Sequence, residues 1–115
     1  PISPGQEDYR GVVRHILERA RPGDAIVTRL VWDQDPDARA TGWRYYVERS
    51  PPELAARAPT EYRLPDYAPA LAHDRVWIFV RRRWSEEGIR ALRAEFPTEE
   101  ITPVGAVMSV RLYSR

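Results

Sequence analysis

The sequence predicts an α/β fold: a three-layer, Rossmann-like sheet that is mostly parallel, with an antiparallel C-terminal strand. Amphipathic helical stripes alternate with short apolar runs, as in helices packed on a parallel sheet. Two of these runs are rich in β-branched residues and lack strict alternation, which is typical of strands buried on both faces. The last run alternates with a period of two, which indicates an antiparallel strand. The 115 residues contain no repeat or linker, so we expect a single domain over 1–115.

A first helix is expected over residues 7–20. Its apolar residues recur with the i, i+3, i+4, i+7 spacing of one helical face. They are Tyr9, Val12, Val13, Ile16, Leu17 and Ala20. Glu7 and Asp8 favour the positive N-terminal end of the helix, and the pair Pro22-Gly23 ends it in a tight turn.

A first strand is expected at 24–32, where a mostly apolar, β-branched run follows this turn directly. An acidic turn comes next in the sequence. Within it, Asp35 suits the N-cap position of a second helix and Pro36 suits the first helical position. We therefore expect a helix from there until the prolines that begin at Pro51.

Residues 51–69 are proline-rich and predict only short elements. These are helical turns at 53–57 and near 66–72 and a short strand at 61–64. Stronger elements follow in the rest of the chain. A second buried strand is expected at 75–81, and a helix capped by Ser85 at 85–96.

The end of the chain predicts a pair of strands. Apolar residues alternate with polar ones over 106–113, which indicates a terminal strand antiparallel to its neighbour. Gly105 offers the turn that joins this strand to the preceding segment, 100–104.

The composition excludes several classes of chemistry. All 18 basic residues are arginine, and the chain has no cysteine. A Schiff base, a P-loop lysine, thiol catalysis, disulfides and cysteine-based zinc sites are therefore ruled out. A net charge of +1 leaves little surplus for nucleic acid, so no nucleic-acid partner is expected. No run approaches the roughly 18 apolar residues of a membrane span.

The acidic turn and its aromatic neighbours are the first candidate site. Trp32, Asp33 and Asp35 follow the expected first strand, at the end of a parallel strand where α/β sheets bind ligands, and Trp43 lies further along. No metal is expected, because a calcium loop would need Gly and Glu where Ala38 and Arg44 stand. The competing interpretation is a helix cap with a solvated loop. No glycine-rich loop is present, so no cofactor is expected.

The second candidate site is a basic cluster formed by Arg81, Arg82, Arg83 and Trp84. It could contact anionic headgroups of a membrane, or, in a weaker interpretation, nucleic acid. A solvated strand-to-helix loop is the alternative. The two histidines, His15 and His73, lie outside any metal-ligand spacing and are expected on the surface. No residue is assigned a catalytic role.

Several segments together resemble a known family. They are Glu7-Asp8-Tyr9-Arg10-Gly11-Val12-Val13, Arg21-Pro22-Gly23-Asp24-Ala25-Ile26-Val27, Tyr45-Tyr46, Arg75-Val76-Trp77-Ile78-Phe79-Val80 and Val110-Arg111-Leu112-Tyr113. This succession resembles the soluble C-terminal domain of bacterial multi-pass membrane glycosyltransferases, those similar to dolichyl-phosphate-mannose-protein mannosyltransferase and aminoarabinose transferase. The resemblance spans nearly the whole chain through short motifs that are mostly structural.

The resemblance implies a non-catalytic accessory domain on the extracytoplasmic side of the cell membrane. In that family the active-site acidic residues lie in the membrane-embedded part, which uses a polyprenyl-phosphate sugar as donor. The expected partners are therefore that part of the same chain and a lipid-linked sugar or its acceptor. Because the chain begins at Pro1 without an initiator Met, we expect a fragment with no activity alone. The alternative is a free-standing soluble α/β module that binds a ligand or protein through residues 33–37.

Overall fold

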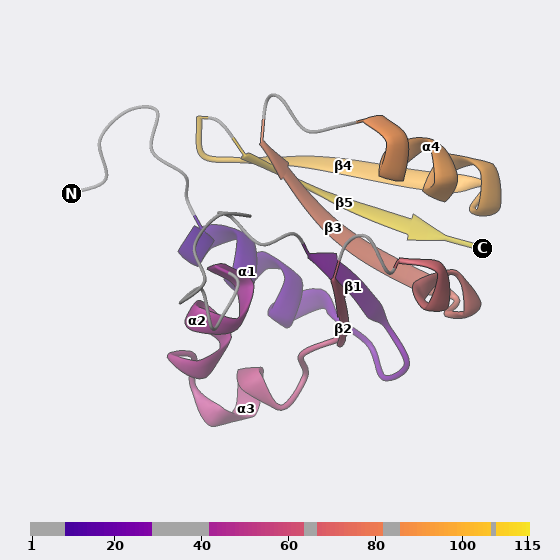
Figure 1. Cartoon of the computed structure of the whole chain (residues 1–115). Coiled ribbons are helices and arrows are strands. Elements are labelled where there is room, and N and C mark those ends of the chain that lie inside the picture. Colours follow the sequence, from indigo (N-terminus) through magenta and orange to yellow (C-terminus); the bar gives the residue numbers. More distant parts are fainter. Residues whose placement is uncertain (1–8, 29–41, 64–66, 82–85, 107) are drawn as a thin grey trace.

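Five strands form one mixed sheet in the order β2-β1-β3-β5-β4 (Figure 1). The computed structural model describes residues 9–28, 42–63, 67–81, 86–106 and 108–115. In these ranges the strands are β1 (Ala25–Thr28), β2 (Thr60–Arg63), β3 (Arg75–Arg81), β4 (Thr98–Val104) and β5 (Met108–Ser114). The helices are α1 (Tyr9–Arg19), α2 (Gly42–Glu48), α3 (Pro52–Ala55), the 3-10 helix η1 (Ala68–Ala72) and α4 (Glu86–Glu95).

The directions of the strands explain why the sheet is mixed. β1 pairs in parallel with both β2 and β3, whereas β5 is antiparallel to both β3 and β4. Since β5 opposes both of its neighbours, β4 runs in the same direction as β3. The segments β3, α4 and β4 thus form a split β-α-β unit with β5 between its strands. The expected α/β class and antiparallel C-terminal strand are confirmed.

The elements lie close to where the sequence predicts them, with shifted ends. α1 lies inside the predicted range 7–20, and β2 is displaced by one residue from 61–64. β4 begins at Thr98, two residues before the expected segment, and residue 106 belongs to a turn rather than to β5. The second half of the expected first strand and the start of the expected second helix fall in 29–41, outside the described residues.

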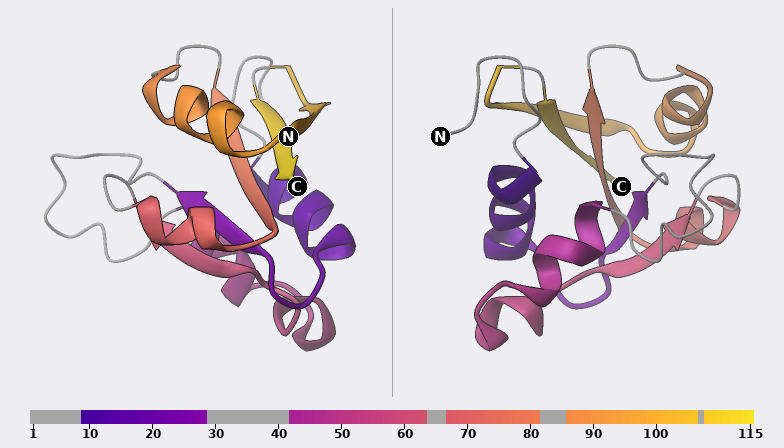
Figure 2. Two further views of the ribbon diagram at one scale, coloured as in Figure 1. Left: turned by 90° about the vertical axis from the view of Figure 1, so that its right-hand side faces the viewer. Right: turned by 60° about the vertical axis from the view of Figure 1, so that its left-hand side comes forward.

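One face of the sheet is covered by α1, α2 and α3, and we call it the α1 face (Figure 2). The apolar stripe of α1 is buried there against side chains of β1, β3 and β5. The buried residues are Val12, Val13, Ile16, Leu17, Ile26, Trp43, Trp77, Met108, Val110 and Leu112. The predicted stripe of the first helix is therefore confirmed as part of the core.

The opposite face is covered by α4 and η1, and we call it the α4 face. The predicted stripe of α4, formed by Ile89, Leu92 and Phe96, is buried on this side. It packs with Ala25, Val27, Ala70, Val76, Ile78, Val80 and Tyr113. Because β1 contributes to both faces, all four of its residues are buried, as expected for a central parallel strand.

Glycine shapes two of the turns that link these elements. Gly23, between α1 and β1, has φ of 89°, and Gly105, after β4, has φ of 68°. Both values lie in the left-handed region, which glycine enters without the steric cost that a side chain brings. Both turns were expected from the sequence. The first one places Asp24, the residue after Gly23, in the core.

Candidate functional site

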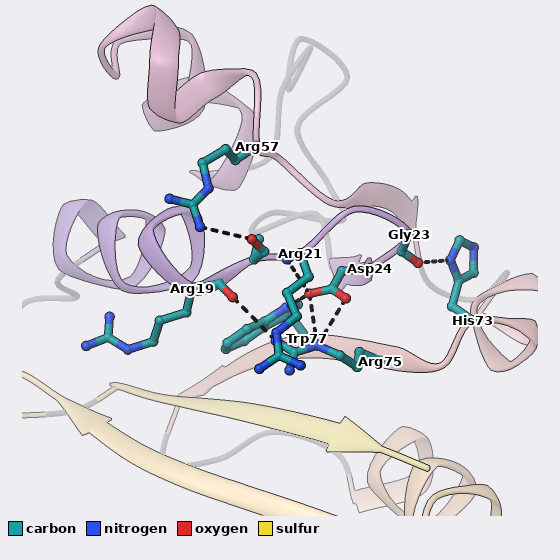
Figure 3. A network of polar contacts seen from close by, with 9 residues as sticks. Arg19, Arg21, Gly23, Asp24, Arg57, His73, Arg75 and Trp77 are labelled. Atoms are coloured by element: carbon teal, nitrogen blue, oxygen red, sulfur yellow. Dashed lines mark hydrogen bonds and ion pairs between the residues drawn. The ribbon is translucent and has the colours of Figure 1, made fainter.

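Asp24 is the centre of a buried polar network at the start of β1 (Figure 3). Its carboxylate is 3% exposed, and Oδ2 accepts hydrogen bonds from the Arg21 backbone N–H at 3.0 Å and from Trp77 Nε1 at 2.8 Å. Arg75 Nε lies 3.1 Å from Oδ1 and 3.2 Å from Oδ2. The Asp24 carbonyl also accepts from the N–H of Thr60 at 3.0 Å. One residue therefore joins the α1–β1 turn to β2 and β3.

Arginines cap the C-terminal end of α1 beside this network. Arg57 donates to the carbonyls of Glu18 and Ala20 at 3.0 and 3.1 Å. Arg75 Nη2 donates to the carbonyl of Arg19 at 3.4 Å, and Figure 3 shows Arg57 and Arg75 reaching this helix end from separate elements. These cations satisfy carbonyls that have no partner within the helix and offset the negative end of its dipole.

A pocket of about 400 Å³ opens on the α1 face, next to the end of α1. One side of it is basic and is lined by His15, Arg19, Arg21 and Arg75. The rest is lined by Trp77, Glu100, Thr102, Val110 and Leu112. Pairing in the sheet aligns Trp77 with Leu112 and Leu112 with Glu100, so these three form a row across β3, β5 and β4. The pocket therefore has a sheet floor and a cationic wall.

His15 stands half-buried between the helix and this floor. Its ring meets the Trp77 ring edge-on, with centroids 6.3 Å apart. Burial lowers the pKa of His15 below its ordinary value of 6.5, and the nearby charge of Arg19 lowers it further, while Glu18 opposes the change. The neutral imidazole is thus the dominant form at pH 7. The expectation of a plain surface histidine does not describe this residue.

His73 has a structural role at the other side of the turn. Its Nε2 lies 2.8 Å from the Tyr62 hydroxyl and its Nδ1 lies 2.7 Å from the Gly23 carbonyl. With both ring nitrogens engaged, His73 ties β2 to the turn that presents Asp24. It lies outside the lining of the pocket.

The acidic candidate site falls mostly outside the described residues. Trp32, Asp33 and Asp35 all lie in 29–41. Only Trp43 of this set is described, and it is 3% exposed. Its ring is stacked on that of Phe79, with centroids 6.4 Å apart and an interplanar angle of 25°. Trp43 is thus a core residue of the α1 face in this structure.

The basic candidate cluster is only partly described. Arg81 ends β3 and pairs with Met108 of β5. Arg82, Arg83 and Trp84 lie outside the described residues. The structure therefore brings together a different set of arginines: Arg19, Arg21 and Arg75. Arg19 and Arg21 are close in the sequence, but Arg75 is 56 residues from Arg19, so no local run of charge indicates this set.

A second polar cluster lies on the α4 face and has a structural character. The Tyr113 hydroxyl donates to Glu99 Oε2 at 2.5 Å, and Arg93 Nε donates to the same oxygen at 2.9 Å. The hydrogen bond from Arg93 is the main cause that lowers the pKa of Glu99. Burial, followed by the bond to Glu99, raises the pKa of Tyr113 to about 12.

This cluster predicts how stability responds to alkaline pH. The folded state holds the Tyr113 proton more tightly than the unfolded state does. Its contribution is fully present below pH 10 and is lost as the pH rises from about 10 to about 12. Since the chain has neither lysine nor cysteine, side chains with an ordinary pKa near 10 are all tyrosines. Tyr113→Phe is expected to make the fall in unfolding free energy over this range shallower, as measured by urea titration. Parallel pH curves for the two proteins would contradict this assignment.

Two kinds of feature are absent from the described residues: a cluster of metal ligands and a membrane-spanning helix. In that part of the chain no group of three or more His, Cys, Asp or Glu side chains could hold a metal ion. Within the same residues, none of the helices has the length and hydropathy to cross a membrane. The site is thus a basic pocket beside a buried carboxylate.

Comparisons with protein-family models, with curated proteins and with solved structures give no match for this chain.

Proposed function

We propose that this chain is a non-catalytic, extracytoplasmic accessory domain of a membrane glycosyltransferase that uses a polyprenyl-phosphate sugar. The observation that carries the proposal is where the five segments of the family resemblance lie. Their described residues belong to α1, the turn with β1, α2, β3 and β5. The strands β1, β3 and β5 are consecutive in the sheet, and both helices pack on the α1 face. The resemblance therefore follows one contiguous block of the fold.

Contacts between these segments support the same proposal. The rings of Tyr9 in α1 and Tyr46 in α2 are stacked, with centroids 6.5 Å apart. Asp24 in the second segment binds Arg75 and Trp77 in the fourth. Motifs that are short in the sequence thus meet in space. The proposal includes the finer description of the fold as a Rossmann-like, three-layer arrangement, which is supported by helices on both faces of the sheet.

The non-catalytic part of the proposal is supported by the roles of the polar residues. Asp24, His73, Glu99 and Tyr113 each bond to groups that connect elements of the fold. These side chains stabilise the chain instead of facing a reacting group. In this proposal the chemistry belongs to the membrane-embedded part, and the domain positions a donor headgroup or an acceptor.

The reading frame upstream of Pro1 tests the proposal directly. We expect it to encode several membrane-spanning helices with acidic residues in extracytoplasmic loops. The complete protein should then transfer sugar from a polyprenyl-phosphate donor, while the present chain alone should show no turnover. A soluble upstream region, a start codon near Pro1, or sugar transfer by the isolated chain would contradict the proposal.

A further inference from the structure

The pocket on the α1 face carries a surplus of positive charge. Three guanidinium groups line it, from Arg19, Arg21 and Arg75, against one carboxylate, from Glu100. Asp24 engages Arg75 through its Nε atom. The charges of Arg19 and Arg21 are therefore the ones left to face a ligand.

These two arginines differ from the others at the end of α1 in how they are held. Among the described residues, the side chain of Arg21 makes no hydrogen bond or ion pair. Its backbone N–H donates to the Asp24 carboxylate, and its backbone carbonyl accepts from the Asp24 N–H. Arg19 is 53% exposed, donates from Nη1 to the His15 carbonyl, and lies 3.8 Å from Glu18. An exposed pair at that distance is weak, so the Arg19 guanidinium can turn toward an anion at small cost.

The C-terminal end of α1 lies beside the pocket, and its carbonyl groups would repel an anion if they had no hydrogen-bond donors. The carbonyls of Glu18, Arg19 and Ala20 already accept hydrogen bonds from arginines. These bonds offset the partial negative charge that the last turn would present. The cationic wall is thus built on a neutralised helix end.

The volume of the pocket and the residues of its floor indicate which groups a ligand could have besides its negative charge. A volume of about 400 Å³ lies in the range of small-molecule sites and leaves space beyond a bare inorganic anion. Val110 and Leu112 give the floor an apolar strip. Thr102 and Glu100, on β4, border that strip with groups that accept hydrogen bonds from hydroxyls.

We propose that this pocket binds a small organic phosphate that carries hydroxyl groups. Arginine forks bind phosphate oxygens in pairs, and the two available guanidinium groups match the charge of a phosphate dianion. The hydroxyl-bearing part then lies over the apolar strip toward Thr102 and Glu100. This inference goes beyond the proposed function and does not depend on it, because it concerns residues of this chain alone.

His15 provides a built-in reporter of the proposed ligand. Its ring contacts Trp77 of β3, and the charges of Arg19 and Glu18 on α1 act on it. Arg21 from the turn, Arg75 from β3 and Glu100 from β4 line the same pocket. A bound phosphate adds negative charge beside the imidazole and so favours its protonated form. Its pKa is therefore expected to rise when the pocket is filled. His73, whose ring nitrogens face Tyr62 and Gly23, serves as the internal control.

The test uses glycerol 3-phosphate as the probe and NMR of the two histidine rings as the readout. We expect saturable shifts of the His15 resonances and a rise of the His15 pKa, while the His73 resonances should not shift on addition of the probe. Glycerol at the same concentration, with sodium chloride matching the ionic strength, should give no such shifts. Equal responses to glycerol 3-phosphate and to these controls would overturn the proposal.

Two matched charge variants separate the pocket from general electrostatic attraction. Arg21→Gln is expected to weaken binding by about five-fold or more, since it removes one guanidinium contact. Arg90→Gln makes the same change on an exposed residue of α4, on the opposite face, and should leave the affinity unchanged. Unfolding curves of both variants should match those of the parent chain. Equal affinities for the two variants would contradict the assignment.

A vesicle experiment distinguishes a free phosphate from the glycerophosphate headgroup of a lipid, a phosphodiester that carries one charge. Cosedimentation is measured with phosphatidylglycerol vesicles and with phosphatidylcholine vesicles as control. Binding to phosphatidylglycerol that glycerol 3-phosphate displaces, and that Arg21→Gln weakens, assigns the pocket to a headgroup. Binding of the free probe without vesicle binding assigns it to a soluble ligand. Vesicle binding that the free probe does not displace would contradict a phosphate pocket.

Discussion

Replacing Asp24 with alanine is expected to lower the free energy of unfolding by about 3–5 kcal/mol. The carboxylate is 3% exposed and accepts from Arg75, from Trp77 and from the backbone of the α1–β1 turn. Its removal leaves the buried Trp77 N–H without an acceptor and Arg75 without its counter-ion. Loss of the acceptor of a buried N–H and loss of the counter-ion of a mostly buried guanidinium both carry a desolvation cost. Urea unfolding followed by tryptophan fluorescence measures the change.

Two further variants test whether the loss of unfolding free energy in Asp24→Ala comes from the buried carboxylate. Asp24→Asn keeps the shape and one acceptor oxygen, so its loss should be smaller than that of the alanine variant. Asp74→Asn removes a carboxylate that is 93% exposed and lies 3.8 Å from Arg115, so a change below about 0.5 kcal/mol is expected. If Asp24→Ala and Asp74→Asn cost the same, the buried network does not stabilise the fold as described.

Ile78→Ala should produce the second large loss, about 2–5 kcal/mol. Ile78 lies in β3, has no exposed surface, and packs in the cluster under α4. Truncation removes buried methylene groups and leaves a cavity between the sheet and α4, which the surrounding side chains fill only in part. The measurement is again the free energy of unfolding in urea.

Ile101→Ala is the matched control for this truncation. Ile101 is also in a strand, β4, but 49% of its surface is exposed. The same chemical change should therefore cost less than about 1 kcal/mol, mainly through the lower strand propensity of alanine. Equal losses at the two positions would show that burial under α4 is not the source of the stabilisation.

The helices and strands were predictable where their pattern repeats within a few residues. The stripe of α1 and the stripe of α4 are both buried as their spacing predicts. The alternation at the end of the chain also placed Met108, Val110 and Leu112 on the α1 face. The same alternation did not indicate Tyr113, which points to the other face and is buried under α4. A period-two pattern describes one face of a strand, and β5 is covered on both.

The candidate site was less predictable. The sequence drew attention to local runs of charge: the aspartates of 33–37 and the arginines of 81–83. The pocket described here instead takes its arginines from the end of α1, the following turn and the start of β3. Trp43, a candidate binding residue, is instead buried in the core of the α1 face, with its ring stacked on that of Phe79.

Residue types and short-range periodicity were sufficient to establish the α/β class, the helix stripes, the glycine turns and the lack of lysine and cysteine chemistry. Most of these features depend on residues only a few positions apart, so the sequence alone is sufficient to predict them. The strand order, the burial of Asp24 and the basic pocket depend on contacts between distant segments. Asp24 and Trp77 are 53 residues apart, and their hydrogen bond exists because β1 and β3 pair side by side. Sheet pairing is a long-range choice among many registers, and it alone brings these groups together.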